Sequence, residues 1–539
     1  MDAILLERAT VVRIAYLVFA FAAAYCTLWL LIGASMLPGG AGWALTLLYL
    51  CSVLVGKLMA LLSKRLPPLL GMLIAGLLLR NIPGGAITAD VPLLGQSFDW
   101  WSRWTRAAAL AVIMLRAGLG LDLDKLRKLG LATARLAFLP CLFEALAVAV
   151  LSGLLLGLTP AWGGTLGFVL AAVSPAVVVP GMLDLGQRGY GTAKGVPTMV
   201  VAAASFDDVL AIAGFGVCLA LAAGVEVSSG AGPPSTVENA TANLTSAASG
   251  SPDEVPLAWL ILKAPTELLA GIVFGWLYGV LTAAPASEHA LFRHGAWTGN
   301  LPAPGLGSAV HFRVAVTGAL LSVVGGKSIK FSGGGALGAL VLGATAGRLW
   351  PSDAKKEVQT HVNNLWATLQ PALFGLLGAA VDVASIDPAI LGSGLAVVAG
   401  ALTIRILVTR LALIGSGLTP SEARLVCVAW LPKATVQAAV GGTALDMMVE
   451  NGYGADAEAR GRLVLMLSVL VILLTAPIGA IGIGMLGPLW LPYDGPAASD
   501  TPAAKAPAAK APAAKEEGQL AIVAEAVHVD VSAPAPARD

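Results

Sequence analysis

The feature that most restricts the fold of this chain is a long apolar run that carries two adjacent carboxylates. Residues 195–224 contain no other charged side chain, and Asp207 and Asp208 lie near the middle of the run. At about 1.5 Å per residue, a helix of this length crosses a hydrocarbon layer about 30 Å thick, and both aspartates then lie close to the bilayer midplane. Placing an ionisable group at that depth carries a large free-energy penalty, so such a group is taken to have a function. The pair therefore predicts a membrane-spanning helix with a polar site at its centre.

Similar apolar runs follow one another along the chain. Of its 539 residues, 57% are hydrophobic and 12% are charged, and the mean hydropathy is +0.82. This composition is far too apolar for a soluble globular protein. The runs predict an all-α polytopic membrane protein with about 14 transmembrane helices in the lipid bilayer. A net charge of +1 gives no indication of a nucleic-acid partner, and five single cysteines in apolar runs indicate neither a disulfide framework nor a zinc site.

The basic residues predict which loops face the cytoplasm, with both termini on that side. The basic segments that fall inside are Lys64/Arg65, 125–128, Arg188/Lys194, Arg293, 348–356 and Arg424. Lys327 and Lys330 are exceptions, because they fall outside. The loop at 225–256 has no Lys or Arg and carries candidate glycosylation sites at Asn239 and Asn243, so it is expected to be extracellular or lumenal.

Four charged sites lie deep in separate apolar runs. They are Glu144, the Asp207/Asp208 pair, Arg405 and Lys433. Each alone would be very costly in a membrane, whereas acids and bases that face one another in a water-accessible cavity neutralise each other, as they do in ion pathways and proton relays. For Glu144 and Arg405, a structural ion pair that only fixes helix packing is an open alternative, because arginine keeps its proton.

Two of the apolar runs contain prolines near their centres. One includes Pro175 and Pro180, and the other includes Pro432 directly before Lys433. Proline removes a backbone donor and clashes with the preceding turn, so both helices are expected to unwind near the midplane and expose carbonyl groups to a cavity. The spans around these two runs cross in opposite directions, which makes an inverted repeat with one broken helix in each half. Such a repeat is typical of secondary transporters, whereas one proline motif alone would fit a kinked helix without a transport role.

Four longer motifs resemble a known family. RAGLGL from Arg116, VSPAVVVPGML from Val173, KGVPTMVVAAASFDDVLAI from Lys194 and AWLPKATVQAA from Ala429 are similar to the animal NHA-type sodium/proton antiporters. These form subfamily 9B of the sodium/hydrogen exchangers, in the cation:proton antiporter superfamily. The resemblance extends from about residue 106 to about residue 491. It implies a homodimer in which each chain has a dimer domain and a six-helix core with two crossed, discontinuous helices.

The resemblance also implies exchange of Na⁺ or Li⁺ for H⁺ and a role in pH homeostasis. It makes Asp207 and Asp208 the ion-binding and proton-carrying carboxylates, and Lys433 the lysine beside the crossing, with Glu144 as its candidate partner. Arg405 stands where bacterial relatives have a lysine. The outer loop with its two sequons and the repeated APAAK of the tail depart from the family pattern.

The chemistry of the residues agrees with this implication. Na⁺ and Li⁺ are hard cations that need oxygen ligands, and the supporting site is expected to include the hydroxyls of Ser174, Ser205 and Thr435 and the carbonyls freed at Pro175. A proton and a cation then compete for the same carboxylates, and exchange follows from that competition. No cofactor is expected beyond the transported ions. The spans contain no nucleophile with histidine and no metal-ligand cluster, so an enzyme is not expected.

These interpretations divide the chain into seven regions. They are a cytoplasmic N-terminus at 1–10, dimer-domain spans at 11–128, the first half of the core at 129–224, the outer loop at 225–256, dimer-domain and linking spans at 257–384, the second half of the core at 385–492, and a disordered cytoplasmic tail at 493–539. The expected location is the plasma membrane, an endolysosomal membrane or a mitochondrial membrane.

Two other functions remain open from the sequence. A cation channel would use the same charges, and a sodium-coupled symporter of an organic solute would need a roomy polar pocket beside the aspartates. The small apolar flanks AAAS and LAIAG argue against such a pocket. His311 is expected at a surface, with tuning of the pH response as an alternative. The stoichiometry is open, because a permanent charge on Arg405 could remove one proton-carrying group.

Overall fold

The computed structural model describes residues 19, 22–63, 66–82, 98–121, 123–228, 257–283, 308–328, 332–385 and 387–495. All of them belong to the first of two compact units, Met1–Ala497, and none to the second, Ala498–Asp539. Asn239, Asn243, most of the predicted outer loop and the APAAK repeats lie outside the described residues.

Within the described ranges, regular structure is helical apart from one isolated antiparallel bridge between Tyr190 and Tyr493. This confirms the all-α prediction. Seven described spans are long and apolar enough to cross a membrane, and four shorter helices are also apolar. The number of about 14 spans stays a prediction, because it counts segments that lie partly outside the described ranges.

One set of helices, called the first group here, packs around α12 and α13. It comprises α2 (Ala41–Leu62), α3 (Pro68–Asn81), α4 (Phe98–Gly120), α10 (Leu257–Ala283), α11 (Ser308–Ser328), α12 (Ser332–Leu349) and α13 (Ser352–Ala379). Glycines let their backbones touch. A Cβ atom at Gly76 would collide with the carbonyl of Gly375, and one at Gly271 with the carbonyl of Gly334. Small residues therefore set the spacing of these helices, as is common in membranes.

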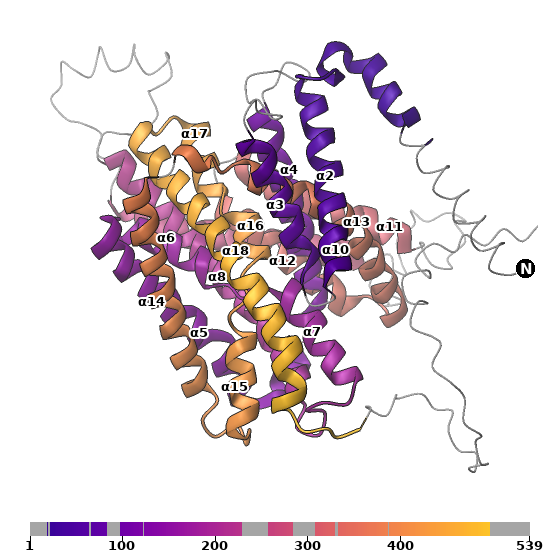
Figure 1. The fold of residues 1–539 in the computed structure, drawn as a ribbon, viewed down its shortest axis with the longest axis vertical. Helices are drawn as coiled ribbons and strands as arrows, with labels where there is room; N and C mark the ends of the chain where they lie inside the picture. The colour runs from indigo at the N-terminus through magenta and orange to yellow at the C-terminus, as the bar shows by residue number, and fades with distance from the viewer. Residues whose placement is uncertain are drawn as a thin grey trace, which may run out of the picture. The chain divides into compact units, whose positions relative to one another are not determined.

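The remaining described helices form the second group. It comprises α5 (Leu123–Leu156), α6 (Pro160–Ala171), α7 (Pro175–Gln187), α8 (Val196–Ser228), α14 (Pro388–Ala412), α15 (Pro420–Ala429), α16 (Thr435–Val440), α17 (Thr443–Asn451) and α18 (Ala455–Trp490). Both predicted interruptions are present, since α6 stops before Pro175 and α15 stops well before Thr435. Figure 1 shows α17 at the opposite end of this group from α7 and α15.

Two polar segments form the first turns of long helices. Trp100, Trp101 and Trp104 lie in the first turns of α4. Lys355 and Lys356 lie near the start of α13, which continues without a break to Ala379. Hydropathy locates the apolar centre of a helix but gives no signal for a polar end that continues it.

The two groups meet along a seam. On one side of the seam α8 packs against α10 and α12, and elsewhere α16 contacts α4 and α13 while α18 contacts α3. Because α8 carries the aspartate pair, the polar centre of the second group lies on a helix that also contacts the first group.

Candidate ion-binding site at the crossing of two broken helices

Direct hydrogen bonds join the two unwound segments. The backbone N–H of Ser174 donates to the carbonyl of Pro432 at 2.8 Å, and the hydroxyl oxygens of Ser174 and Thr435 lie 3.4 Å apart. On the far side, the N–H of Lys433 donates to Oγ1 of Thr475 on α18 at 3.0 Å. The prolines break the helical ladders, and these contacts fix the open ends against each other. Three residues predicted for the supporting site, Ser174, Pro175 and Thr435, therefore lie at one crossing.

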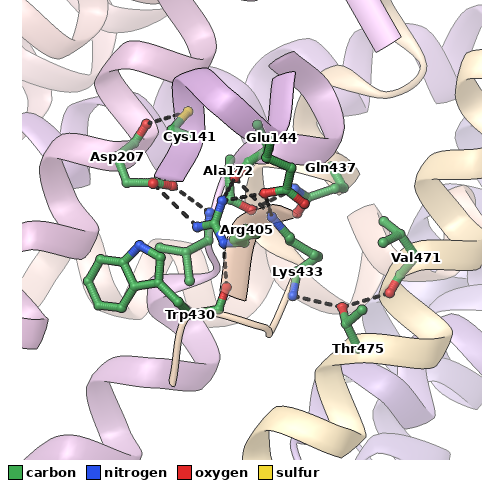
Figure 2. A network of polar contacts seen from close by, with 12 residues as sticks. Cys141, Glu144, Ala172, Asp207, Arg405, Trp430, Lys433, Gln437, Val471 and Thr475 are labelled. Carbon is green, nitrogen blue, oxygen red and sulfur yellow. Dashed lines mark hydrogen bonds and ion pairs between the residues drawn. The ribbon is translucent and has the colours of Figure 1, made fainter. Parts of the chain in front are cut away.

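Both carboxylate oxygens of Asp207 have partners at this crossing. Its Oδ2 accepts the backbone N–H of Val173 at 2.6 Å, and its Oδ1 lies 3.3 Å from Nη2 of Arg405. Figure 2 shows the carboxylate directed at the guanidinium. Asp207 is buried, and each of its oxygens has a partner, so this aspartate ties α8 to both the break after α6 and to α14.

Glu144 is shared by two cations. Nη1 of Arg405 donates to Oε2 of Glu144, and Nζ of Lys433 donates to the same oxygen at 2.7 Å. Both cations also bond the carbonyl of Ala171, and Nε of Arg405 donates to the carbonyl of Trp430 at 2.5 Å. In Figure 2 Arg405 lies between Asp207 and Glu144. The expected pair of Glu144 and Arg405 is thus part of a four-residue cluster, and Lys433 contacts Glu144 in it.

The charges of this cluster balance without Asp208. Two carboxylates, Asp207 and Glu144, face two cations, Arg405 and Lys433, and all four side chains are buried. Asp208 is only 3% exposed, and its Oδ1 has no hydrogen-bond partner among the residues that the structure describes. Asp208 is therefore the carboxylate whose charge the described cluster leaves uncompensated.

A cavity of about 620 Å³ leads along α8 from the helix ends at Gly120 and Gln187. The α8 residues that line it include Pro197, Val201 and Ser205. They recur at the spacing of one helix face, and Asp208 is the next position on that face. The hydroxyl of Ser205 donates to the carbonyl of Val201 at 3.3 Å. Ser205 thus lines the cavity about one turn before Asp208, which is not itself among the lining residues, whereas Ser174, Pro175 and Thr435 lie at the crossing.

Gln437 is a polar residue of the crossing that the sequence analysis did not single out. Its Nε2 donates to the carbonyls of Val169 and Ala172, both at 2.9 Å, and so satisfies acceptors left open where α6 ends. The sequence signal was an amide two residues after Thr435 in a buried run. His311, expected at a surface, is instead buried on α11 and packs edge-on against Trp350, with ring centroids 5.3 Å apart.

Comparisons with known proteins agree with this geometry. Residues 44–487 match the family described as "Sodium/hydrogen exchanger, transmembrane". Sodium/hydrogen exchanger 9B2 of Mus musculus is 41% identical over 469 residues, which are 86% of this chain and 76% of that protein. Sodium/hydrogen exchanger 9B1 of Homo sapiens is 37% identical over 471 residues, which are 87% of this chain and 81% of that protein.

A solved structure shares the fold. The sodium proton antiporter MjNhaP1 from Methanocaldococcus jannaschii at pH 8 superposes with a TM-score of 0.57 at 20% identity and covers 83% of this chain and 98% of its own. The inverted pair of broken helices predicted from the prolines is therefore the architecture of a known antiporter fold. Together, the crossing, the family match over residues 44–487 and the identity to exchangers 9B1 and 9B2 show that this chain belongs to the sodium/hydrogen exchanger family, in its 9B branch.

Proposed function

We propose that this chain exchanges Na⁺ for H⁺ across a membrane by alternating access, and that Asp208 is the carboxylate for which the two ions compete. Relatives that share most of their length with this chain are named sodium/hydrogen exchangers, which supports the exchange. The charge balance at the crossing supports the assignment to Asp208, because Asp207 and Glu144 already face Arg405 and Lys433.

Competition follows from the cost of an isolated buried charge. A carboxylate in a low-dielectric site is unfavourable unless a proton neutralises it or a cation lies against it. Either ion removes the penalty, and a protonated carboxyl no longer attracts Na⁺. Na⁺ or Li⁺ at Asp208 would take further oxygen ligands from hydroxyls such as those of Ser174 and Thr435 and from unwound carbonyls. The apparent affinity for Na⁺ is then expected to fall as the pH is lowered.

This proposal separates the roles of the two aspartates, which the sequence alone treated as one site. Asp207 holds Arg405 and the backbone N–H of Val173, so we assign it to positioning the crossing. Glu144 and Lys433 support the same cluster. Removal of either aspartate should therefore impair exchange, but for different reasons.

The rival functions fit less well. The small flanks did not exclude a cavity, since one of about 620 Å³ is lined by Ala202 and Ser205, but none of the described side chains that line it is charged, so it offers no ionic partner to a charged organic solute. The relatives are named exchangers rather than channels or symporters. We also propose that the chain acts as a homodimer with cytoplasmic termini in the plasma membrane, an endolysosomal membrane or a mitochondrial membrane. It is an integral membrane protein of a transporter family.

The test compares two isosteric substitutions on adjacent residues of α8. Purified wild-type protein, Asp208→Asn and Asp207→Asn are reconstituted in liposomes with an imposed pH gradient, and Na⁺-driven proton movement is recorded. Na⁺ is expected to raise the melting temperature of the wild-type protein, because it binds the folded state. Asp208→Asn should abolish both exchange and this rise, without lowering the melting temperature measured in the absence of Na⁺. Asp207→Asn should lower the melting temperature, because Arg405 loses a buried partner. Wild-type exchange by Asp208→Asn would rule out this site.

A further inference from the structure

A second buried ion cluster joins the two helix groups away from the crossing. Nη2 of Arg106 on α4 lies 2.5 Å from Oδ1 of Asp446 on α17, and Nη1 of Arg106 donates to Oγ of Ser102 at 2.6 Å. Nζ of Lys327 on α11 lies 3.9 Å from Oδ2 of Asp446. The three charged side chains are 8%, 5% and 12% exposed. No role at the ion-binding crossing explains this cluster.

The cluster spans the seam. Arg106 and Lys327 belong to α4 and α11 of the first group, whereas Asp446 belongs to α17, which packs on α18 of the second group. The backbone of α17 and its preceding turn lie close to Arg106, since a Cβ atom at Gly442 would come within 3.0 Å of Nε of Arg106. Because Gly442 has no side chain, the guanidinium of Arg106 can lie directly against the backbone of the second group.

The cluster also lies on the other side of the crossing from the cavity. Along α4, Arg106 is roughly 21 Å from Gly120, where the cavity begins. In Figure 1, α17 lies at one end of the second group and α7, whose last turn lines the cavity, lies towards the other. The seam is therefore closed by buried ions on the side opposite the cavity.

We propose that Arg106 and Asp446 form the outer gate of the exchanger, closed while the cavity on the inner side is open. This inference rests on the proposed alternating access. In that cycle the two groups move relative to each other, so the site faces each side in turn. The Arg106–Asp446 contact is one that such a movement must separate.

An ion pair suits a contact that has to open. Burying two charges carries a large desolvation penalty, and their attraction offsets it only in good geometry. When the seam opens, water reaches both ions and removes that penalty, so separation is less costly than for a buried charge that stays dry. The gate also explains why Lys327 is basic although it lies on the outer side, where few basic residues are expected. Its ammonium group faces Asp446.

The test locks the gate with a reversible cross-link. Arg106→Cys/Asp446→Cys is reconstituted, treated with a short bifunctional methanethiosulfonate that a reductant cleaves, and assayed for exchange before treatment, after treatment and after reduction. Exchange should fall to the level of protein-free liposomes and return on reduction. The matched control is Arg106→Cys/Lys327→Cys, which joins two helices of the first group beside the same carboxylate and should keep exchanging. Undiminished exchange by the cross-linked gate pair would overturn the proposal.

A second measurement covers the case in which the double variant does not fold. Ala109→Cys, buried on α4 about one turn closer than Arg106 to the cavity end of the helix, is labelled from the outer side with a membrane-impermeant thiol reagent, alone and combined with Asp446→Asn. Loss of the pair should speed labelling, and equal rates would contradict the gate. Failure of the proposed exchange would be seen separately, as no exchange by the untreated wild-type protein.

Discussion

Adjacent residues of a helix point about 100° apart, so Asp207 and Asp208 enter different surroundings although their side chains are identical. Asp207 points at Arg405 and the end of α6, and Asp208 continues the face of α8 that lines the cavity. One carboxylate is held by a permanent cation, and the other is the one that we propose binds a mobile cation. The difference comes from direction alone.

At the same scale, Glu144 should be the most sensitive member of the four-residue cluster. Glu144→Gln removes the anion that both Arg405 and Lys433 contact, and a broken buried pair costs about 3–5 kcal/mol. Lys433→Met alone should cost less, because Arg405 still faces Glu144. The double variant Glu144→Gln/Lys433→Met restores the balance of charge. Its loss of stability should fall short of the sum of the single losses by about 0.5–3 kcal/mol. Denaturation in detergent measures all three, and additive losses would mean that the two residues are not coupled.

At the scale of the element, α8 combines a buried face with a face that lines the cavity. The sequence predicts this helix from hydropathy and predicts both broken helices from their prolines, because those signals are local. The contact of Lys433 with Glu144 is implied only by the family resemblance, and the bonds of Gln437 to the open end of α6 are not predicted at all, because these pairs are distant in sequence and depend on how the broken helices cross. Nor does the sequence predict the burial of His311, since a single histidine carries no periodic signal.

The cavity face of α8 gives an element-scale prediction. Ala202 lines the cavity, whereas Ala213 on the same helix is half-buried and is not among the lining residues. Ala202→Cys should exchange normally until a charged methanethiosulfonate reagent reaches it from the inner side, and the bulky cation attached there should then block access to Asp208. Ala213→Cys, treated in the same way, should remain active. Continued exchange by fully labelled Ala202→Cys would show that ions take another path.

At the scale of the whole molecule, the count of charges sets the expected stoichiometry. If Arg405, Lys433, Asp207 and Glu144 keep their charges through the cycle, only Asp208 alternates between H⁺ and Na⁺. The moving group then carries the same net charge in both directions, which predicts exchange of one Na⁺ for one H⁺.

Such an exchange should not respond to voltage. In liposomes with a fixed pH gradient, a potential set by K⁺ and valinomycin should leave the initial rate of Na⁺-driven proton movement unchanged. The Na⁺/H⁺ ratio measured at the reversal point should be one. A rate that rises or falls with the potential would identify a second group that gains or loses a proton during transport, and Lys433 would be the first to test.

The touching glycine backbones of the first group also determine where the molecule can deform. Side chains that pack against each other can relieve strain by changing rotamer. A backbone carbonyl in direct contact with a glycine cannot do so, as at Gly76 with Gly375 and Gly271 with Gly334. The second group has contacts of the same kind, since a Cβ atom at Gly167 of α6 would collide with the carbonyl of Ala145 of α5, so we expect strain produced by relative displacement of the two groups to concentrate in the seam. Replacing one of the first group's glycines with alanine would push two helices of that group apart and loosen their packing. We expect this to slow turnover, although no residue at the ion-binding crossing is changed.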